Sequence, residues 1–231
     1  KDHFVFRLRN NFSVSVQRKI IPEFKESFFE ETYLKHLPSK LLQVSNPVIL
    51  DIGANVGFFS AFVMQKFQYP RIISFEPIKR NYVLLQKNLS SCSSEKLTLL
   101  NKAVSNTSGE IKLQFDSGED ITTSASLLDK QNGGYEETVI STRLQDIFND
   151  YGLNKIDLLK SDCEGAEYDI FYNTPVELFS KINCIALETH AGKGEKENNK
   201  ALADFFRKQG YIVQTKNEDL IWAYKEQDDW V

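Results

Sequence analysis

Residues 49–60 read ILDIGANVGFFS, and this stretch predicts the fold of the chain. Residues 48–52 are apolar except for Asp51, as expected of a short buried strand. Two glycines in residues 53–57 then turn the chain, and apolar residues follow at helical spacing at Phe58, Phe59, Phe62, Val63 and Phe67. A strand, a glycine turn and a helix form a nucleotide-binding crossover, because glycine lets backbone N–H groups approach a ligand and a helix N-terminus favours electron-rich groups.

A second apolar strand, residues 72–75, follows that helix and ends at Glu76. Folds of this kind have an acid at the end of the second strand, where it holds both hydroxyls of a ribose. We therefore expect Glu76 to bind the sugar of a nucleoside-containing cofactor.

The glycine spacing and Asp51 indicate which cofactor this is. A dinucleotide fingerprint reads G-x-G-x-x-G, whereas Gly53, Asn55 and Gly57 stand here at alternate positions. An acid two residues before the first glycine repels a pyrophosphate and attracts an ammonium or a sulfonium group. S-adenosylmethionine carries both cations, has no phosphate and offers a ribose to Glu76. In the alternative interpretation, Asp51 merely caps the turn and the glycines only permit a tight bend.

The composition suits one globular domain with a small N-terminal addition. The 231 residues are 41% hydrophobic and 26% charged. The net charge of −4 and the lack of a basic run argue against a nucleic-acid surface. No apolar stretch approaches the ~20 residues that span a bilayer. No signal peptide is recognised, and Cys92, Cys163 and Cys184 are few and widely spaced, so we expect reduced thiols and a cytoplasmic protein.

Strands alternate with helices along most of the chain. This order predicts a Rossmann-like α/β fold with a doubly wound, mostly parallel sheet and an antiparallel terminal strand. A third strand is expected over residues 97–104. The polar residues 91–95 are expected to form a loop, and residues 116–134 a long loop that is either mobile or serves the substrate.

The first 45 residues are expected to form an appendage to a catalytic domain over residues 46–231. Residues 1–21 alternate loosely and predict a β-hairpin, and residues 24–37 predict a helix that Pro38 stops. Three roles are open for this appendage: it closes over the cofactor, it shapes the entrance for the substrate, or it simply covers an edge of the sheet.

Two further predicted strands also end in polar residues, Asp162-Cys163-Glu164 and Glu188-Thr189-His190. In open α/β sheets the ligand sits beyond the carboxyl ends of the strands, so these residues are expected beside the cofactor. An aliphatic hydroxyl reacts at neutral pH only if a partner takes its proton. Asp162, Glu188 and His190 are the candidates, and His190 has a suitable intrinsic pKa.

Each of these residues also has a structural interpretation. Glu164 and Glu167 can cap and charge the first turn of the following helix. Glu188 can accept backbone hydrogen bonds, and His190 can be a solvated loop residue. Asp162, Glu164, Glu188 and His190 can instead coordinate a divalent ion that acidifies a hydroxyl directly. The spacing does not establish such a site, so no metal is assigned.

The chain resembles the FkbM-type methyltransferase family, whose members use S-adenosylmethionine and mostly methylate hydroxyls of sugars, polyketides and other small metabolites. The matching motifs are VILDIGANVGFFS (48–60), SFEP (74–77) followed by Asn81, NKAVSNTSGEIKL (101–113), LLKSDCEGAEYDI (158–170) and ALETH (186–190). DIGANxG and FEP occur in many methyltransferases, whereas their combination with KxDxEGAE and ExH is more specific. Ser161 and Cys163 depart from the aliphatic residues expected there.

The resemblance implies a role for each matched position. Asp51, Gly53, Asn55 and Gly57 would line the methionine side of the cofactor, with Phe58 beside them. Glu76, followed by Pro77, would hold the ribose, and Ala103 would lie by the adenine. Asp162 and Glu164 would face the methyl group, with Glu188 and His190 opposite.

We therefore expect an S-adenosylmethionine-dependent O-methyltransferase that acts on a hydroxyl of a small molecule or carbohydrate. One alternative is a nicotinamide-dependent oxidoreductase, against which Asp51 and the missing third glycine count. Another is a non-catalytic cofactor-binding module on the same fold. A nucleic-acid amino-methyltransferase is disfavoured, because such enzymes need a proline-aromatic loop where this chain has Asp162 to Gly165. The oligomeric state stays open, with a homo-oligomer as one alternative.

Overall fold

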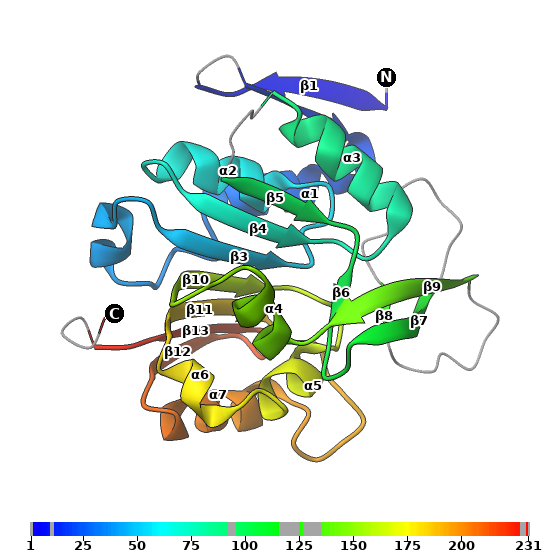
Figure 1. Cartoon of the computed structure of the whole chain (residues 1–231). Helices are drawn as coiled ribbons and strands as arrows, with labels where there is room; N and C mark the ends of the chain where they lie inside the picture. Colours follow the sequence, from blue (N-terminus) through cyan, green and yellow to red (C-terminus); the bar gives the residue numbers. More distant parts are fainter. Residues whose placement is uncertain are drawn as a thin grey trace.

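A seven-stranded sheet forms the centre of the molecule (Figure 1). In spatial order its strands are β12 (Ile212–Lys216), β13 (Leu220–Tyr224), β11 (Ile182–Glu188), β10 (Ile156–Ser161), β3 (Val48–Ile52), β4 (Arg71–Phe75) and β5 (Leu97–Leu100). The last five are parallel, whereas β13 runs antiparallel to β11 and β12 antiparallel to β13. The predicted doubly wound sheet with an antiparallel terminal pair is confirmed. The computed structural model describes residues 2–9, 12–91, 96–115, 125–126, 135–226 and 230.

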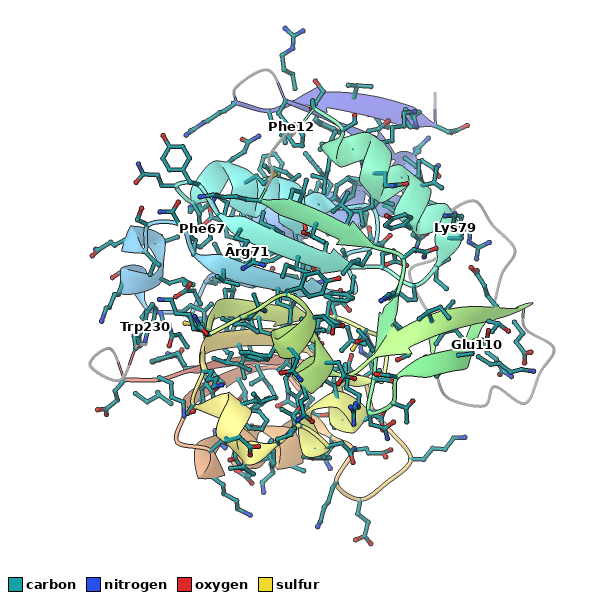
Figure 2. All side chains as sticks on the ribbon, viewed as in Figure 1. Phe12, Phe67, Arg71, Lys79, Glu110 and Trp230 are labelled. Atoms are coloured by element: carbon teal, nitrogen blue, oxygen red, sulfur yellow. The ribbon has the colours of Figure 1, made fainter. Side chains whose placement is uncertain are left out.

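Helices cover both faces of this sheet. They are α1 (Ile21–Lys25), α2 (Phe58–Lys66), α3 (Lys79–Leu89), α4 (Leu144–Asp150), α5 (Glu167–Tyr172), α6 (Val176–Phe179) and α7 (Asn199–Lys208). Side chains alternate along a strand, so Leu50 packs into the core against α4 to α7 while Ile49 packs against α2 on the other face. Figure 2 shows the side chains that fill the space between the sheet and these helices. None of the helices in the described ranges has both the length and the apolarity needed to cross a bilayer.

The N-terminal segment begins with the predicted hairpin, formed by β1 (His3–Arg7) and β2 (Ser13–Gln17). The single helix predicted over residues 24–37 is wrong. Helix α1 continues into a π-helical turn, Glu26–Glu30, which ends at Glu31 in a left-handed conformation with φ 49°, and a 3-10 turn follows over Ser39–Gln43. Phe24 packs against the hairpin and α3, whereas Leu34 packs against the central sheet, and the chain bends between them.

A four-stranded sheet stands beside the central one (Figure 1). Its order is β6 (Ala103–Val104), β9 (Tyr135–Thr142), β7 (Gly109–Phe115) and β8 (Ala125–Ser126). The third strand predicted over residues 97–104 is therefore interrupted. Asn101 lies in the gap, where its side-chain amide donates to the carbonyl oxygens of Glu76 at 2.9 Å and Pro77 at 2.7 Å, so that β5 ends beside the tip of β4. The loop predictions for residues 92–95 and, apart from β8, for residues 116–134 lie outside the described residues.

Candidate active site

The turn after β3 is held against the tips of the neighbouring strands. The backbone N–H groups of Gly53 and Ala54 both donate to the carbonyl oxygen of Phe75, at 3.0 and 2.9 Å. Gly53 has φ 73°, and a Cβ on it would overlap the carbonyl oxygen of Asp162. Gly57 has φ 90° and lies against Leu85 of α3. The two glycines therefore let the turn pack closely on β10 and on α3.

Asp51 lies in β3, and its carboxylate has partners inside the protein. Its side chain is fully buried, and it pairs with Lys160 at 3.3 Å while the Ser60 hydroxyl donates to it at 2.6 Å. Burial lowers the pKa of Lys160, but the charges of Asp51 and Asp162 outweigh it and raise the pKa, so Lys160 is protonated. The charge of Asp51 is thus compensated within the protein. Asp51 is not among the residues that line the pocket described below, and its contact with the cofactor stays a prediction.

Glu76 stands at the predicted position, the end of β4, with 4% of its surface exposed. Its carboxylate accepts the backbone N–H groups of Asn55 at 2.8 Å and Ile78 at 2.9 Å. Burial raises its pKa to about 7, against the effect of those two hydrogen bonds. The carboxylate thereby ties the glycine turn to Ile78, the N-cap residue of α3.

A pocket opens over these strand tips, with about 670 Å³ of space between the lining atoms when the open solvent at its mouth is included. Of the predicted cofactor residues, the pocket is lined by Gly53, Asn55, Glu76, Pro77, Ala103, Asp162 and Glu164. Gly57 stands behind the turn, and Phe58 lines a neighbouring cavity instead. The predicted positions that form this pocket come from β4, β6, β10 and the turn after β3.

The tips of β10 and β11 bring four ionisable side chains together. The Nε2 atom of His190 lies 3.4 Å from Glu164 and 3.9 Å from Glu188, while its Nδ1 atom lies 3.1 Å from Glu167. Glu167 is fully buried at the start of α5 and also accepts the backbone N–H groups of Cys163 and Gly165, at 3.2 and 3.0 Å. These bonds hold Glu167 in place, and Glu167 in turn fixes the ring of His190.

The acidic neighbours of His190 favour its protonated form. Burial alone would lower its pKa, but the hydrogen bond and charge of Glu167, with the charges of Glu164 and Asp162, raise it to about 9. Burial also raises the pKa of Glu164, to about 7, although the charge of His190 opposes this. A histidine that already holds its proton is poorly suited to act as a base at neutral pH.

Asp162, Glu164 and His190 also have the arrangement of possible metal ligands, with one candidate atom of each within 4.8 Å of the others. The same atoms are already engaged in ion pairs, because Nε2 of His190 lies 3.4 Å from Glu164 and Nδ1 lies 3.1 Å from Glu167. The ion pairs account for the arrangement without a metal, and none is assigned.

The protonation of His190 predicts a pH-dependent stability. Because its folded pKa is raised from 6.5 to about 9, chiefly by Glu167, the stabilisation of the protonated ring is fully present below pH 6.5 and is lost as the pH rises through about 9. We expect this contribution to be on the order of 2 kcal/mol. Thermal melting of the protein and of His190→Gln should therefore differ below pH 6.5 and converge above pH 9. A constant difference between the two curves would contradict the assignment.

Sequence reasoning missed several residues around the site. Lys160 lies within the quoted KxDxEGAE motif, but the sequence predicted no function for it. For Glu167 it predicted only a favourable charge in the first turn of a helix. Tyr33 reaches the site from the N-terminal segment, where its hydroxyl donates to Asp162 at 3.1 Å. No sequence pattern connects Tyr33 with a residue so distant along the chain, so only the tertiary structure reveals this contact.

Comparisons with known proteins agree with this geometry. A family model described as the methyltransferase FkbM domain matches residues 51–213. Methyltransferase sdnD of Sordaria araneosa is 27% identical over 212 residues, which cover 78% of this chain and 79% of that protein. The 2-O-methyltransferase NoeI of Sinorhizobium fredii is 27% identical over 179 residues, covering 71% and 72%.

Among solved structures, a 16S rRNA N2 G1207 methyltransferase of T. thermophilus, in complex with AdoMet and guanosine, resembles this chain with a TM-score of 0.51. It is 12% identical, and the match covers 97% of this chain and 50% of that one, a likeness that concerns the fold alone. The family match spans more than two thirds of the chain and includes the strand tips that form the pocket. The chain therefore belongs to the methyltransferase FkbM domain family and is an S-adenosylmethionine-dependent methyltransferase.

Proposed function

We propose that this enzyme transfers the methyl group of S-adenosylmethionine to a hydroxyl of a sugar or another small molecule. The observation that carries the proposal is the group of carboxylates at the tips of β10 and β11, directly beside the pocket that Glu76 lines. Such carboxylates suit the removal of a proton from an alcohol. The name of the relative NoeI, a 2-O-methyltransferase, points to the same kind of acceptor. Membership of the family argues against the nicotinamide-dependent oxidoreductase.

The residues of the pocket fit the proposed cofactor. Gly53 and Asn55 line the pocket, and the buried Oδ1 atom of Asn55 has no hydrogen-bond partner. An unpartnered buried acceptor favours a ligand with N–H or O–H groups. We assign the ribose hydroxyls to Glu76 and the adenine to the apolar wall at Ile78 and Ala103.

We assign the role of proton acceptor to Glu188, with Asp162 as the second candidate. His190 was also expected in this role, but its raised pKa favours a positioning role, in which the imidazolium orients the carboxylates around it. Burial, followed by the charge of Asp162, raises the pKa of Glu188, which strengthens it as a base. When bound, S-adenosylmethionine supplies an electrophilic methyl group. The work of the protein is to align the acceptor oxygen with it and to remove the hydroxyl proton.

Transfer of a labelled methyl group tests this proposal. The enzyme is incubated with deuteriomethyl S-adenosylmethionine and a panel of free and glycoside-linked sugars, and products are analysed by mass spectrometry and NMR. We expect the label on an oxygen atom of a sugar or small-molecule product. A label found only on nitrogen or carbon would refute O-methylation.

The role of Glu76 gives a separate prediction. Glu76→Ala should weaken the binding of S-adenosylhomocysteine by about tenfold or more, because two charge-assisted hydrogen bonds to the ribose would be lost. Calorimetric titration measures this change. Glu110→Ala, at an exposed residue of β7 that Figure 2 labels, is the matched control and should bind as the unchanged protein does. Equal affinities for all three proteins would remove Glu76 from the cofactor site.

A further inference from the structure

A second cavity adjoins the cofactor pocket on the side of the N-terminal segment. It has about 420 Å³ of space between its lining atoms, open solvent included, and shares Gly53, Asn55 and Asp162 with the first pocket. Its other polar side chains are those of Glu23, Glu26, Ser27, Tyr33 and Lys160. The two cavities therefore meet at the glycine turn. The first lies on the side of Glu76, and the second lies on the side of α1, which contributes Glu23 to its lining.

The second cavity is rich in hydrogen-bond acceptors that lack donors. One carboxylate oxygen of Glu23 and the Oδ1 atom of Asn55 are buried without a hydrogen-bond partner. Unpartnered buried acceptors are costly unless a ligand supplies the missing donors. The cavity therefore suits a ligand group that carries several N–H donors.

The charge of the cavity points in the same direction. Glu23, Glu26 and Asp162 are acidic, and Lys160, the basic residue among those that line it, already pairs with Asp51. Burial, followed by the charges of Glu188 and Asp162, raises the pKa of Glu26 to about 7. A cation next to Glu26 would relieve the repulsion between these carboxylates.

S-adenosylmethionine is an elongated molecule with a nucleoside at one end and an amino acid at the other. If the nucleoside lies over Glu76, the other end extends past Gly53 toward the second cavity. We propose that the N-terminal segment completes the cofactor site, with Glu26 binding the ammonium group of the methionine moiety. This inference rests on the proposed cofactor site, and it gives residues 21–33 a direct role in cofactor binding.

The position of Glu26 supports this role. It begins the π-helical turn Glu26–Glu30, and such turns occur frequently at functional sites. The turn is anchored on both sides, because Phe24 packs in the core with Phe58 and the Trp222 ring N–H donates to the Thr32 carbonyl oxygen at 2.8 Å. The carboxylate of Glu26 is therefore held by a fixed segment.

A pair of ligands tests the inference. S-adenosylhomocysteine carries the amino-acid end, whereas 5′-methylthioadenosine has the same nucleoside and sulfur without it. We expect Glu26→Gln to weaken binding of S-adenosylhomocysteine by about tenfold, the size of one charge-assisted hydrogen bond, and to leave binding of 5′-methylthioadenosine unchanged. Glu30→Gln, at an exposed residue of the same turn, is the control and should change neither affinity. Calorimetry gives all of these affinities.

Each other outcome contradicts the inference in a recognisable way. Equal losses for both ligands would mean that Glu26 supports the nucleoside pocket. No loss for either ligand, with a raised KM for the acceptor, would assign the cavity to the acceptor.

If the unchanged protein bound neither ligand, the proposed cofactor site itself would fail. Unchanged binding of 5′-methylthioadenosine also shows that the variant is folded. If Glu26→Gln does not fold, Glu23→Gln replaces it in the experiment. It should likewise weaken binding of S-adenosylhomocysteine and leave binding of 5′-methylthioadenosine unchanged, and an unchanged affinity for both ligands would contradict the inference.

Discussion

Replacing Glu188 by glutamine is expected to lower kcat by about 10²- to 10⁴-fold, the usual contribution of a general base. Glutamine keeps the shape of the side chain but cannot accept the proton of the hydroxyl. Affinity for S-adenosylhomocysteine should stay the same, because Glu188 is assigned to the acceptor side. Steady-state kinetics and calorimetry on the same preparation separate the two effects.

The control for this experiment is Glu177→Gln, at an exposed residue of α6. It makes the same chemical change away from the site and should leave kcat unaltered. The pH profile adds a second criterion. Because the pKa of Glu188 is raised, activity should fall on the acidic side at a higher pH than for an ordinary glutamate. An unchanged kcat in Glu188→Gln would remove Glu188 from the mechanism and leave Asp162 as the candidate.

Gly53→Ala should have the largest effect on stability. An added Cβ would overlap the backbone carbonyl oxygen of Asp162, and Gly53 also has a left-handed φ of 73°. Backbone cannot move aside as a flexible side chain can, so we expect a loss of about 4 kcal/mol or more, or failure to fold. Chemical denaturation measures the loss. Any variant that does fold should bind S-adenosylhomocysteine poorly, since the turn and β10 would be pushed apart.

Gly152→Ala separates the two causes. Gly152 also has a left-handed φ, 56°, but no atom lies within 4 Å of a Cβ built there. Only the conformational cost applies, about 1 kcal/mol. If the two variants lost the same stability, the close approach between Gly53 and β10 would not matter. The comparison therefore tests the packing of the turn directly.

The sequence predicted the elements whose signals are local. The strand at residues 48–52, the glycine turn and Glu76 at the end of the second strand follow from periodicity and from the chemistry of a turn. The polar ends of β10 and β11 follow from the rule that ligands bind at the carboxyl ends of parallel strands. These features depend on a few consecutive residues, and all of them appear at the predicted positions.

The features that were missed depend on contacts between distant residues. Lys160 lies directly opposite Asp51 in the register of β10 and β3, so the charge that suggested a cationic ligand is paired inside the sheet. Likewise, the intrinsic pKa of His190 suggested a base, but Glu167 at the start of α5 raises that pKa and favours the protonated ring. Neither partner is identifiable without the pairing of strands.

The N-terminal segment shows the same limitation. Its apolar spacing resembles one long helix, yet Phe24 and Leu34 pack in different cores, and the helix is broken at Glu31. The break brings Tyr33 to Asp162. The contribution of this segment to the site thus arises from tertiary packing that overrides helix periodicity.

The most direct test of the account compares two ligands at the pocket over β3 and β4. S-adenosylhomocysteine and NAD both carry an adenosine, but only NAD carries a pyrophosphate. The account predicts that calorimetric titration shows binding of S-adenosylhomocysteine and no binding of NAD, and that Glu76→Ala weakens the former. Binding of NAD in preference to S-adenosylhomocysteine would contradict it.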